Sequence, residues 1–158
     1  MSATAPLALP VTGGCQCGAV RYSLASRPTG AHFCHCRMCQ RAVGGPFAAL
    51  VSVPTEDLAW TAGAPGWFAS SNLATRPFCR DCGTPLGFAY DGSGRINVTI
   101  GSLDDPEIAP IGVHYGVESR LSWVKLCDGL PEVETADDPD SPVTLASLVS
   151  HQAKEAAQ

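Results

Sequence analysis

The spacing of cysteines constrains this 158-residue chain more than any other feature of its sequence. Three of them, Cys34, Cys36 and Cys39, fall within six positions in the stretch FCHCRMC at residues 33–39. Three thiols this close together are one short of the four-cysteine set that is typical of structural zinc. The sequence therefore contains either a damaged metal site or an open one.

Four further cysteines form two pairs, each flanked by glycine. Cys15 and Cys17 lie in the stretch GGCQCG at residues 13–18, and Cys79 and Cys82 form a C-x-x-C pair followed by Gly83. Neither pair completes a tetrahedral site, but together they make the four-thiolate set of a structural zinc ion. The competing interpretation is four free cysteines in the core, where single cysteines are common. The paired spacing with glycine turns favours metal.

If those four cysteines bind one ion, Cys34, Cys36 and Cys39 remain as three protein ligands. Three ligands with an open position are the arrangement of a catalytic zinc ion. Two alternatives stay open. A fourth ligand would make the site inert, and the candidates for it are His32, His35, His114 and Cys127. A disulfide within the cluster is the second alternative, and a reducing compartment disfavours it.

Composition limits the class of protein. Apolar residues make up 45% of the chain and charged residues 16%, with 16 glycines and 13 prolines, which is typical of one compact, turn-rich domain. The formal charge of −5 disfavours a nucleic-acid surface, and seven thiolates binding two zinc ions would make it more negative. With no secretion signal and no long apolar run, the sequence predicts a protein of the reducing cytoplasm that does not enter a membrane.

The hydrophobic pattern predicts short β-strands separated by glycine and proline. The expected strands are residues 19–24, 47–53, 58–61, 66–70, 86–90, 96–103, 111–115 and 121–126. The turn at residues 27–30 closes the first strand. A short helix is expected at residues 37–43, because no helix breaker precedes Gly44. A marginal C-terminal helix is expected at residues 143–156, after an acidic, proline-bearing linker.

We expect three segments: a flexible lead-in at residues 1–12, a zinc-binding domain at residues 13–131, and an acidic linker with a helical tail at residues 132–158. Some other side chains are weaker candidates for function. His114 is a candidate for proton transfer, although a hydrogen-bonded core histidine is the commoner outcome. Arg37 and Arg41 more simply form a solvated helix face than a carboxylate site. Trp123 and Phe47 are expected in the core.

The chain resembles the glutathione-dependent formaldehyde-activating enzyme family, which includes centromere protein V. The resemblance rests on the segments GGCQCGAVRY, CHCRMC, RPFCRDCGTPL and GSLDDP in this order, with His114 and Trp123 downstream, and it spans residues 13–131. It implies a mainly β, β-tent-type fold of short antiparallel strands. It also implies a structural zinc ion on Cys15, Cys17, Cys79 and Cys82, and a catalytic one on Cys34, Cys36 and Cys39. Cys127 has no place in these sets.

The same resemblance implies an activity. Members join glutathione to formaldehyde to give S-hydroxymethylglutathione, as carbon–sulfur lyases, so the expected partners are a small thiol and an aldehyde. An open three-cysteine zinc site suits this reaction, because zinc lowers the pKa of a thiol and polarises a carbonyl oxygen. The competing hypothesis is a non-catalytic zinc module that binds another protein. The acidic balance and the lack of basic runs disfavour a chromatin role for it.

Overall fold

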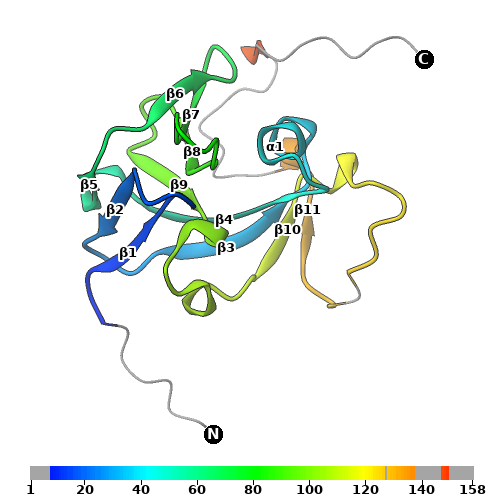
Figure 1. The fold of residues 1–158 in the computed structure, drawn as a ribbon. Helices are drawn as coiled ribbons and strands as arrows, with labels where there is room; N and C mark the ends of the chain where they lie inside the picture. The colour runs from blue at the N-terminus through cyan, green and yellow to red at the C-terminus, as the bar shows by residue number, and fades with distance from the viewer. Residues whose placement is uncertain (1–7, 127, 138–146, 150–158) are drawn as a thin grey trace, which may run out of the picture.

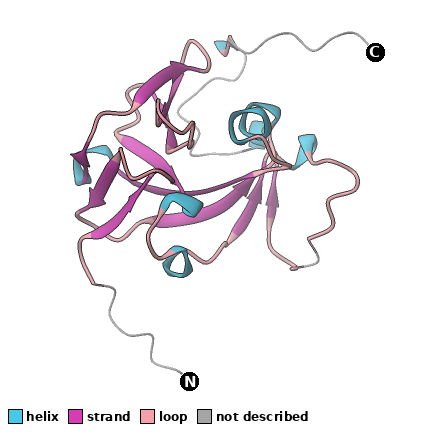
Figure 2. Ribbon diagram, in the orientation of Figure 1, coloured by secondary structure: helices cyan, strands magenta, loops and turns pink. Residues whose placement is uncertain are grey.

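The computed structural model describes residues 8–126, 128–137 and 147–149. Most of its regular structure is β, with one α-helix among the described residues (Figures 1 and 2). The strands are β1 (Val11–Gly14), β2 (Arg21–Leu24), β3 (Thr29–Cys34), β4 (Ala48–Pro54), β5 (Leu58–Ala62), β6 (Gly66–Ala69), β7 (Ala74–Phe78), β8 (Gly87–Tyr90), β9 (Arg95–Thr99), β10 (Val113–Tyr115) and β11 (Glu132–Val133). The helix is α1 (Arg37–Val43). Short 3₁₀ turns occupy Thr55–Asp57, Ile100–Ser102, Pro106–Ile108, Val117–Ser119 and Thr135–Asp137.

The strands form two sheets. The smaller sheet has the order β1-β2-β5, and the larger has the order β11-β10-β3-β4-β9-β8-β7-β6. Figure 1 shows β1, β2 and β5 on one side of the long strand β4, with β6, β7 and β8 above it and α1 at the other side. Neither sheet closes into a barrel. The predicted mainly β, β-tent-type domain is confirmed.

The larger sheet has one face in the core and one facing a cavity. Successive side chains of a strand point to opposite faces. Val51 and Val53 of β4 are fully buried and belong to the main core cluster, whereas Leu50 and Ser52 line the cavity. Strand β9 repeats this alternation, with Ile96 and Val98 in the core and its intervening residues on the cavity side. The sheet therefore separates the hydrophobic core from the candidate site.

The core brings β1 very close to the 3₁₀ turn that follows β9. Gly13 forms an isolated bridge with Leu103, and the fully buried Tyr22 hydroxyl lies 2.8 Å from Ser102 Oγ. A Cβ atom on Gly13 would lie 2.4 Å from the Tyr22 hydroxyl oxygen and 2.5 Å from the Ser102 carbonyl oxygen. Only glycine fits this contact, because neither neighbour is the flexible end of a side chain.

Several expectations about the elements need correction. Residues 121–126 form no strand, and β10 has β3 on one side and β11 on the other. The pairings of β10 with β3 and with β11 are parallel. All other strand pairs among the described residues are antiparallel, as expected. Strands β1, β3, β7 and β11 were not anticipated, and β3 begins at Thr29, inside the expected turn at residues 27–30.

The structure describes part of the expected lead-in and part of the expected linker and tail. Strand β1 begins at Val11, inside the expected lead-in, and β11 with the turn Thr135–Asp137 lies inside the expected linker. The boundaries at residues 12 and 131 stay predictions. The expected helix at residues 143–156 lies outside the described residues, except for residues 147–149. No helix in the described part of the chain has the length and apolar character needed to cross a bilayer.

The close approach at Gly13 predicts a large difference between two glycine substitutions. Gly13→Ala should lower the free energy of unfolding by about 1–3 kcal/mol, because the added methyl overpacks a rigid contact. Gly101→Ala is the matched control: no heavy atom lies within 4 Å of its Cβ position, so the expected change is within about 0.5 kcal/mol. Urea denaturation measures both. Equal effects would contradict the packing described for Gly13.

Candidate metal centres and the adjoining cavity

The first candidate metal centre joins two turns that are distant in sequence. Cys15 and Cys17 lie between β1 and β2, Cys79 and Cys82 lie between β7 and β8, and their four sulfur atoms are all within 4.8 Å of one another. The Sγ–Sγ distances are 3.5 Å for Cys15–Cys17 and 3.8 Å for Cys17–Cys79. Sulfur atoms at the corners of a zinc tetrahedron, with Zn–S of about 2.3 Å, are about 3.8 Å apart. This donor set fits a closed zinc site.

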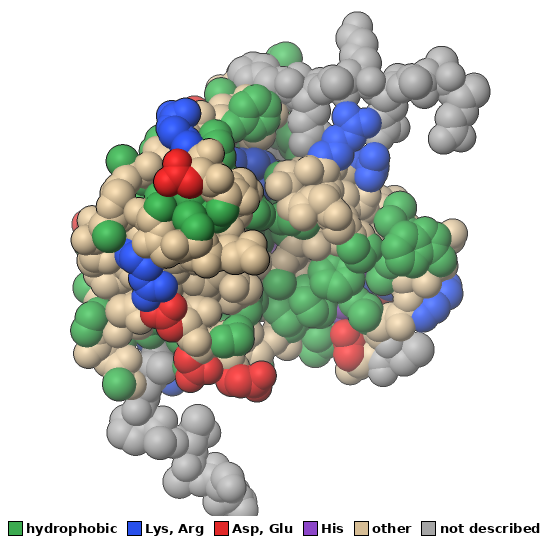
Figure 3. Space-filling model, in the orientation of Figure 1, with side chains coloured by type: hydrophobic (Ala, Val, Ile, Leu, Met, Phe, Trp, Pro, Cys, Tyr) green, Lys and Arg blue, Asp and Glu red, His purple; other side chains and the backbone are tan. Residues whose placement is uncertain are grey.

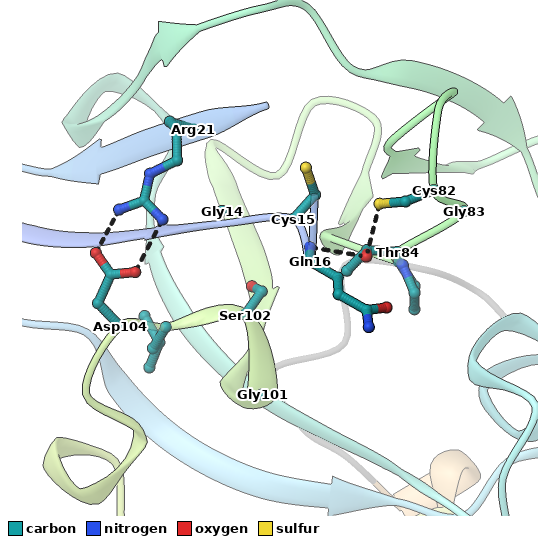
Figure 4. Close-up of a pocket in the computed structure, with 12 residues that line it drawn as sticks. Gly14, Cys15, Gln16, Arg21, Cys82, Gly83, Thr84, Gly101, Ser102 and Asp104 are labelled. Carbon is teal, nitrogen blue, oxygen red and sulfur yellow. Dashed lines mark hydrogen bonds and ion pairs between the residues drawn. The ribbon is translucent and has the colours of Figure 1, made fainter. Parts of the chain in front are cut away.

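Hydrogen-bond donors surround the four-cysteine cluster. The Val20 backbone N–H donates to Cys15 Sγ at 3.2 Å. Figure 4 shows Thr84 between Gln16 and Cys82: the Gln16 backbone N–H donates to the Thr84 hydroxyl at 3.1 Å, and that hydroxyl lies 3.1 Å from Cys82 Sγ. The Thr84 hydroxyl bond is the main cause that lowers the pKa of Cys82 to about 5. Cys82 is therefore prepared as a thiolate, the form that binds metal. The pKa of Cys17, in contrast, is raised to about 12, because a hydrogen bond from the Ala19 backbone that lowers it is outweighed by hydrogen bonds with Cys82 and Cys15.

The second candidate metal centre lies at the junction of β3 and α1. Cys34 is the last residue of β3, Cys36 is the N-cap of α1, and Cys39 lies in its first turn. Cys36 Sγ accepts a hydrogen bond from the Cys39 backbone N–H at 3.4 Å and lies 3.5 Å from Cys34 Sγ. The three sulfur atoms lie within 4.8 Å of one another, and no fourth His, Cys, Asp or Glu among the described residues joins them. The helix expected from the sequence thus positions two of the three thiols.

The three thiols of this second cluster differ in pKa. Hydrogen bonds with Cys36 and Cys39, together with burial, raise the pKa of Cys34. Hydrogen bonds from Cys34 and Cys36, with a further contribution from the positive charge of Arg76, lower the pKa of Cys39. A divalent cation would deprotonate all three. These sulfur donors fit a zinc ion, and no fourth ligand joins them among the described residues.

A cavity of about 740 Å³ adjoins the three-cysteine cluster on the non-core face of the larger sheet. Part of its lining is apolar and aromatic, with Leu50, Phe88, Tyr90, Val113 and Tyr115. Polar side chains also line it, among them His32, Ser52, Arg95, Asn97 and Glu118. An apolar pocket with a few convergent polar groups is typical of a small-molecule site. The open corner of the cluster thus faces a space that a small substrate would fill.

A buried chain of hydrogen bonds supports the three-cysteine turn from the other face. His35 Nε2 lies 2.9 Å from His114 Nδ1, and His114 Nε2 lies 2.9 Å from the Asp128 carboxylate. Burial lowers the pKa of His35 to about 4, so the ring is neutral at pH 7. Since the Asp128 carboxylate only accepts hydrogen bonds, His114 donates to it from Nε2. His114 does not line the cavity, so it supports the turn and does not meet the substrate space.

The remaining predicted residues lie apart from the cavity. Arg37 and Arg41 are absent from its lining, and Arg37 donates to the Gln40 side chain. Phe47, expected in the core, packs on Phe33 and His35 but is only partly buried and belongs to neither core cluster. Trp123, expected in the core, is 68% exposed, because the segment that contains it forms no strand against the sheet. Cys127 lies outside the described residues.

The sequence reasoning missed the charged and aromatic side chains of the cavity wall. Arg76, Phe88 and Tyr90 lie beside the three-cysteine cluster although they are close in sequence to the other metal pair. Arg76 stands three residues before Cys79 in the segment RPFC, which was a usable signal. Its place in the sequence pointed to the cluster of Cys79 and Cys82. The pairing of β7 with β8 instead brings the Arg76 side chain beside Cys39.

Fold and site together define a mainly β protein with two thiolate clusters of the zinc-binding kind. The sequence profile of the family "Glutathione-dependent formaldehyde-activating enzyme" matches residues 10–117. The chain belongs to this family. It is 33% identical over 78 residues to an uncharacterized lyase of Schizosaccharomyces pombe, covering 49% of this chain and 56% of that protein. The chain thus spans little more than half the length of the curated relative it matches.

A crystal structure of a Rhodobacter sphaeroides protein is similar with a TM-score of 0.45 and 22% identity, covering 77% of this chain and 99% of the other. This degree of similarity adds no argument about function.

Loss of one cysteine should have different consequences in the two clusters. The wild-type chain should bind two zinc ions, measured by mass spectrometry of the metal. Cys39→Ser should lose one ion and keep its fold, because its cluster joins residues that α1 already holds together. Cys82→Ser should also lose the fold, because its cluster joins turns 62 positions apart. Circular dichroism tests this, and comparable unfolding of the two variants would show that the clusters do not differ in this way.

The histidine chain predicts a structural effect of His114. His114→Phe should lower the free energy of unfolding by about 1–3 kcal/mol, since it leaves His35 Nε2 buried without its partner. His32→Phe is the matched control, because His32 makes one local hydrogen bond, to the Gly30 carbonyl oxygen, at a partly exposed position. Its expected change is within about 0.5 kcal/mol. Urea denaturation of both variants measures the difference, and a stable His114→Phe protein would refute the supporting role.

Proposed function

We propose that this protein is a zinc-dependent enzyme of the carbon–sulfur lyase type that adds a thiol to formaldehyde at Cys34, Cys36 and Cys39. Glutathione is the thiol that the family description names. The observation that supports the proposal is the position of three convergent buried sulfur atoms at the wall of a 740 Å³ cavity, with no fourth protein ligand among the described residues. When bound there, zinc would lower the pKa of the substrate thiol and act as a Lewis acid.

We further propose that Cys15, Cys17, Cys79 and Cys82 hold the second, structural zinc ion. Four thiolates close the coordination sphere, so this centre offers no position for a substrate. A reducing location such as the cytoplasm belongs to the same proposal, because thiols must stay reduced to bind metal. Figure 3 shows Lys, Arg, Asp and Glu side chains in small separate groups on the face that it presents, with no extended basic surface for a nucleic acid.

The length of the cavity suits a tripeptide thiol. The sheet register places Ser52 four residues along β4 from Ala48, the partner of Cys34, which corresponds to about 13 Å. An extended tripeptide spans about 10–11 Å. Arg95 donates from Nε to Ser52 Oγ at 2.8 Å, so its guanidinium group is held at this end of the cavity. No carboxylate among the described residues pairs with it. It is placed to bind a carboxylate of a thiol whose sulfur reaches the cysteine cluster.

The reaction needs little else from the protein. The thiol sulfur bonds to the formaldehyde carbon, the π electrons of the carbonyl group move to oxygen, and the proton lost by the thiol ends on that oxygen. Apolar walls formed by Leu50, Phe88 and Val113 exclude water from the reacting atoms. The cysteine cluster at one end and Arg95 at the other fix the orientation of the thiol. The reverse step releases formaldehyde and the free thiol.

A non-catalytic zinc module that binds another protein is the alternative function. A module of that kind needs closed metal sites and an exposed surface, whereas this chain presents an incomplete donor set at the wall of a cavity. The geometry favours the enzyme.

Exchange NMR tests the proposed function directly. Mixtures of glutathione and formaldehyde interconvert with S-hydroxymethylglutathione without catalyst, and the zinc-loaded protein should increase the exchange rate at least about tenfold at micromolar concentration. Cys39→Ser protein at the same concentration is the control, because it keeps the fold and loses the proposed centre. An exchange rate that the wild-type protein leaves unchanged would exclude this pair of substrates.

A further inference from the structure

Arg76 is a buried cation without a carboxylate partner. It lies on β7, 8% exposed, and none of the ion pairs of the described residues includes it. Arginine is almost never fully buried unless it is paired, because removing its charge from water is costly. Its position therefore calls for a function or a compensating partner.

Three contacts define the orientation of the Arg76 guanidinium group. One amino group (Nη2) donates to Cys39 Sγ at 3.5 Å. The guanidinium carbon lies 4.7 Å from the centroid of the Phe88 ring, which fixes the plane of the group. Its Nε–H is buried and has no hydrogen-bond partner. The group is thus held firmly beside the three-cysteine cluster with an unused donor.

The guanidinium group of Arg76 lies in the cavity wall, although its buried Nε–H is not itself exposed there. Arg76 lines the 740 Å³ cavity together with Cys34, Cys36 and Cys39, so it forms part of the wall next to the open metal position. Three thiolates and one divalent zinc ion carry a net charge of −1, which the arginine charge offsets. A negatively charged oxygen at this point would otherwise be repelled by the sulfur ligands.

We propose that Arg76 binds the oxygen atom of the electrophilic substrate and stabilises the alkoxide that forms on it. This inference rests on the proposed function and adds the group that receives the developing charge. As the sulfur–carbon bond forms, the carbonyl π electrons move to oxygen, and Arg76 donates N–H hydrogen bonds to that oxygen without losing a proton. The oxygen then takes the proton released by the thiol. Donors placed in advance around an oxyanion are a major source of catalysis.

Formate is the probe for this site, because it is a small planar anion that matches the guanidinium fork. Isothermal titration calorimetry of zinc-loaded wild-type protein should show formate binding, and Arg76→Gln should weaken it about tenfold to a hundredfold. Arg76→Lys, which keeps the charge but not the fork, should bind with intermediate affinity, and it decides the question if Arg76→Gln does not fold. Arg80→Gln is the matched control: Arg80 also stacks on an aromatic ring, Phe78, but is exposed and away from this cavity.

Two further measurements separate binding of the oxygen from a merely structural role. Arg76→Gln protein should keep two zinc ions and bind S-methylglutathione within about twofold of wild type, because the thiol site is intact. In the exchange reaction it should lower kcat and raise KM for formaldehyde at least about tenfold while leaving KM for glutathione within about twofold. Loss of S-methylglutathione binding, or of zinc, would show that Arg76 acts on the architecture of the site and would overturn the proposal.

Formate binding tests the role of Arg76 independently of the exchange reaction. Wild-type protein that binds no formate, or Arg76→Gln and Arg76→Lys proteins that bind it as wild type does, would overturn the role of Arg76. So would formate binding that survives in Arg76→Gln and disappears in Arg95→Gln, since the anion would then sit at the far end of the cavity. A protein that binds formate through Arg76 but does not accelerate glutathione–formaldehyde exchange would refute the proposed substrates and leave the oxygen-binding site in place.

Discussion

The convergence of two distant turns on four sulfur atoms is the constraint on which the rest of the structure depends. Cys15 and Cys17 leave the smaller sheet, Cys79 and Cys82 leave the far end of the larger one, and their sulfur atoms meet within 4.8 Å. Four thiolates at that distance repel one another unless a cation lies between them. In the proposed zinc-bound form, metal binding would therefore contribute to the free energy of folding. The same contact sets where β7 and its Arg76 lie.

The three-cysteine turn receives its rigidity from the opposite side of the sheet. Alternation along the end of β3 sends Cys34 and Cys36 to the cavity wall and the intervening His35 into the interior, where it is fully buried. His35 then meets His114, and His114 meets the Asp128 carboxylate. Helix α1 starts in the same turn, with Cys36 as its N-cap. The three-cysteine cluster needs such external support, because no fourth His, Cys, Asp or Glu of the described residues joins it.

The larger sheet gives the protein two environments in one layer. Its core face carries Val51, Val53 and Val98, all fully buried, and its other face carries the cavity. On that second face the three-cysteine cluster and the buried Arg76 share the cavity with apolar and aromatic side chains and with the polar side chains of Arg95 and Asn97. In the proposed function, the cluster meets the thiol of the substrate and Arg95 meets its carboxylate.

The sequence by itself determined the local parts of this protein. The close spacing within each cysteine group, the bounds of α1 and the strand that became β4 follow from residues that are near one another in the chain. The tertiary structure decided what depends on distant partners. Residues 121–126 form no strand, Trp123 in that segment is exposed, and β10 runs parallel to β3 and β11. The burial of Arg76 beside Cys39 was likewise decided by strand pairing, because the surroundings of a charge depend on which distant strands lie next to it.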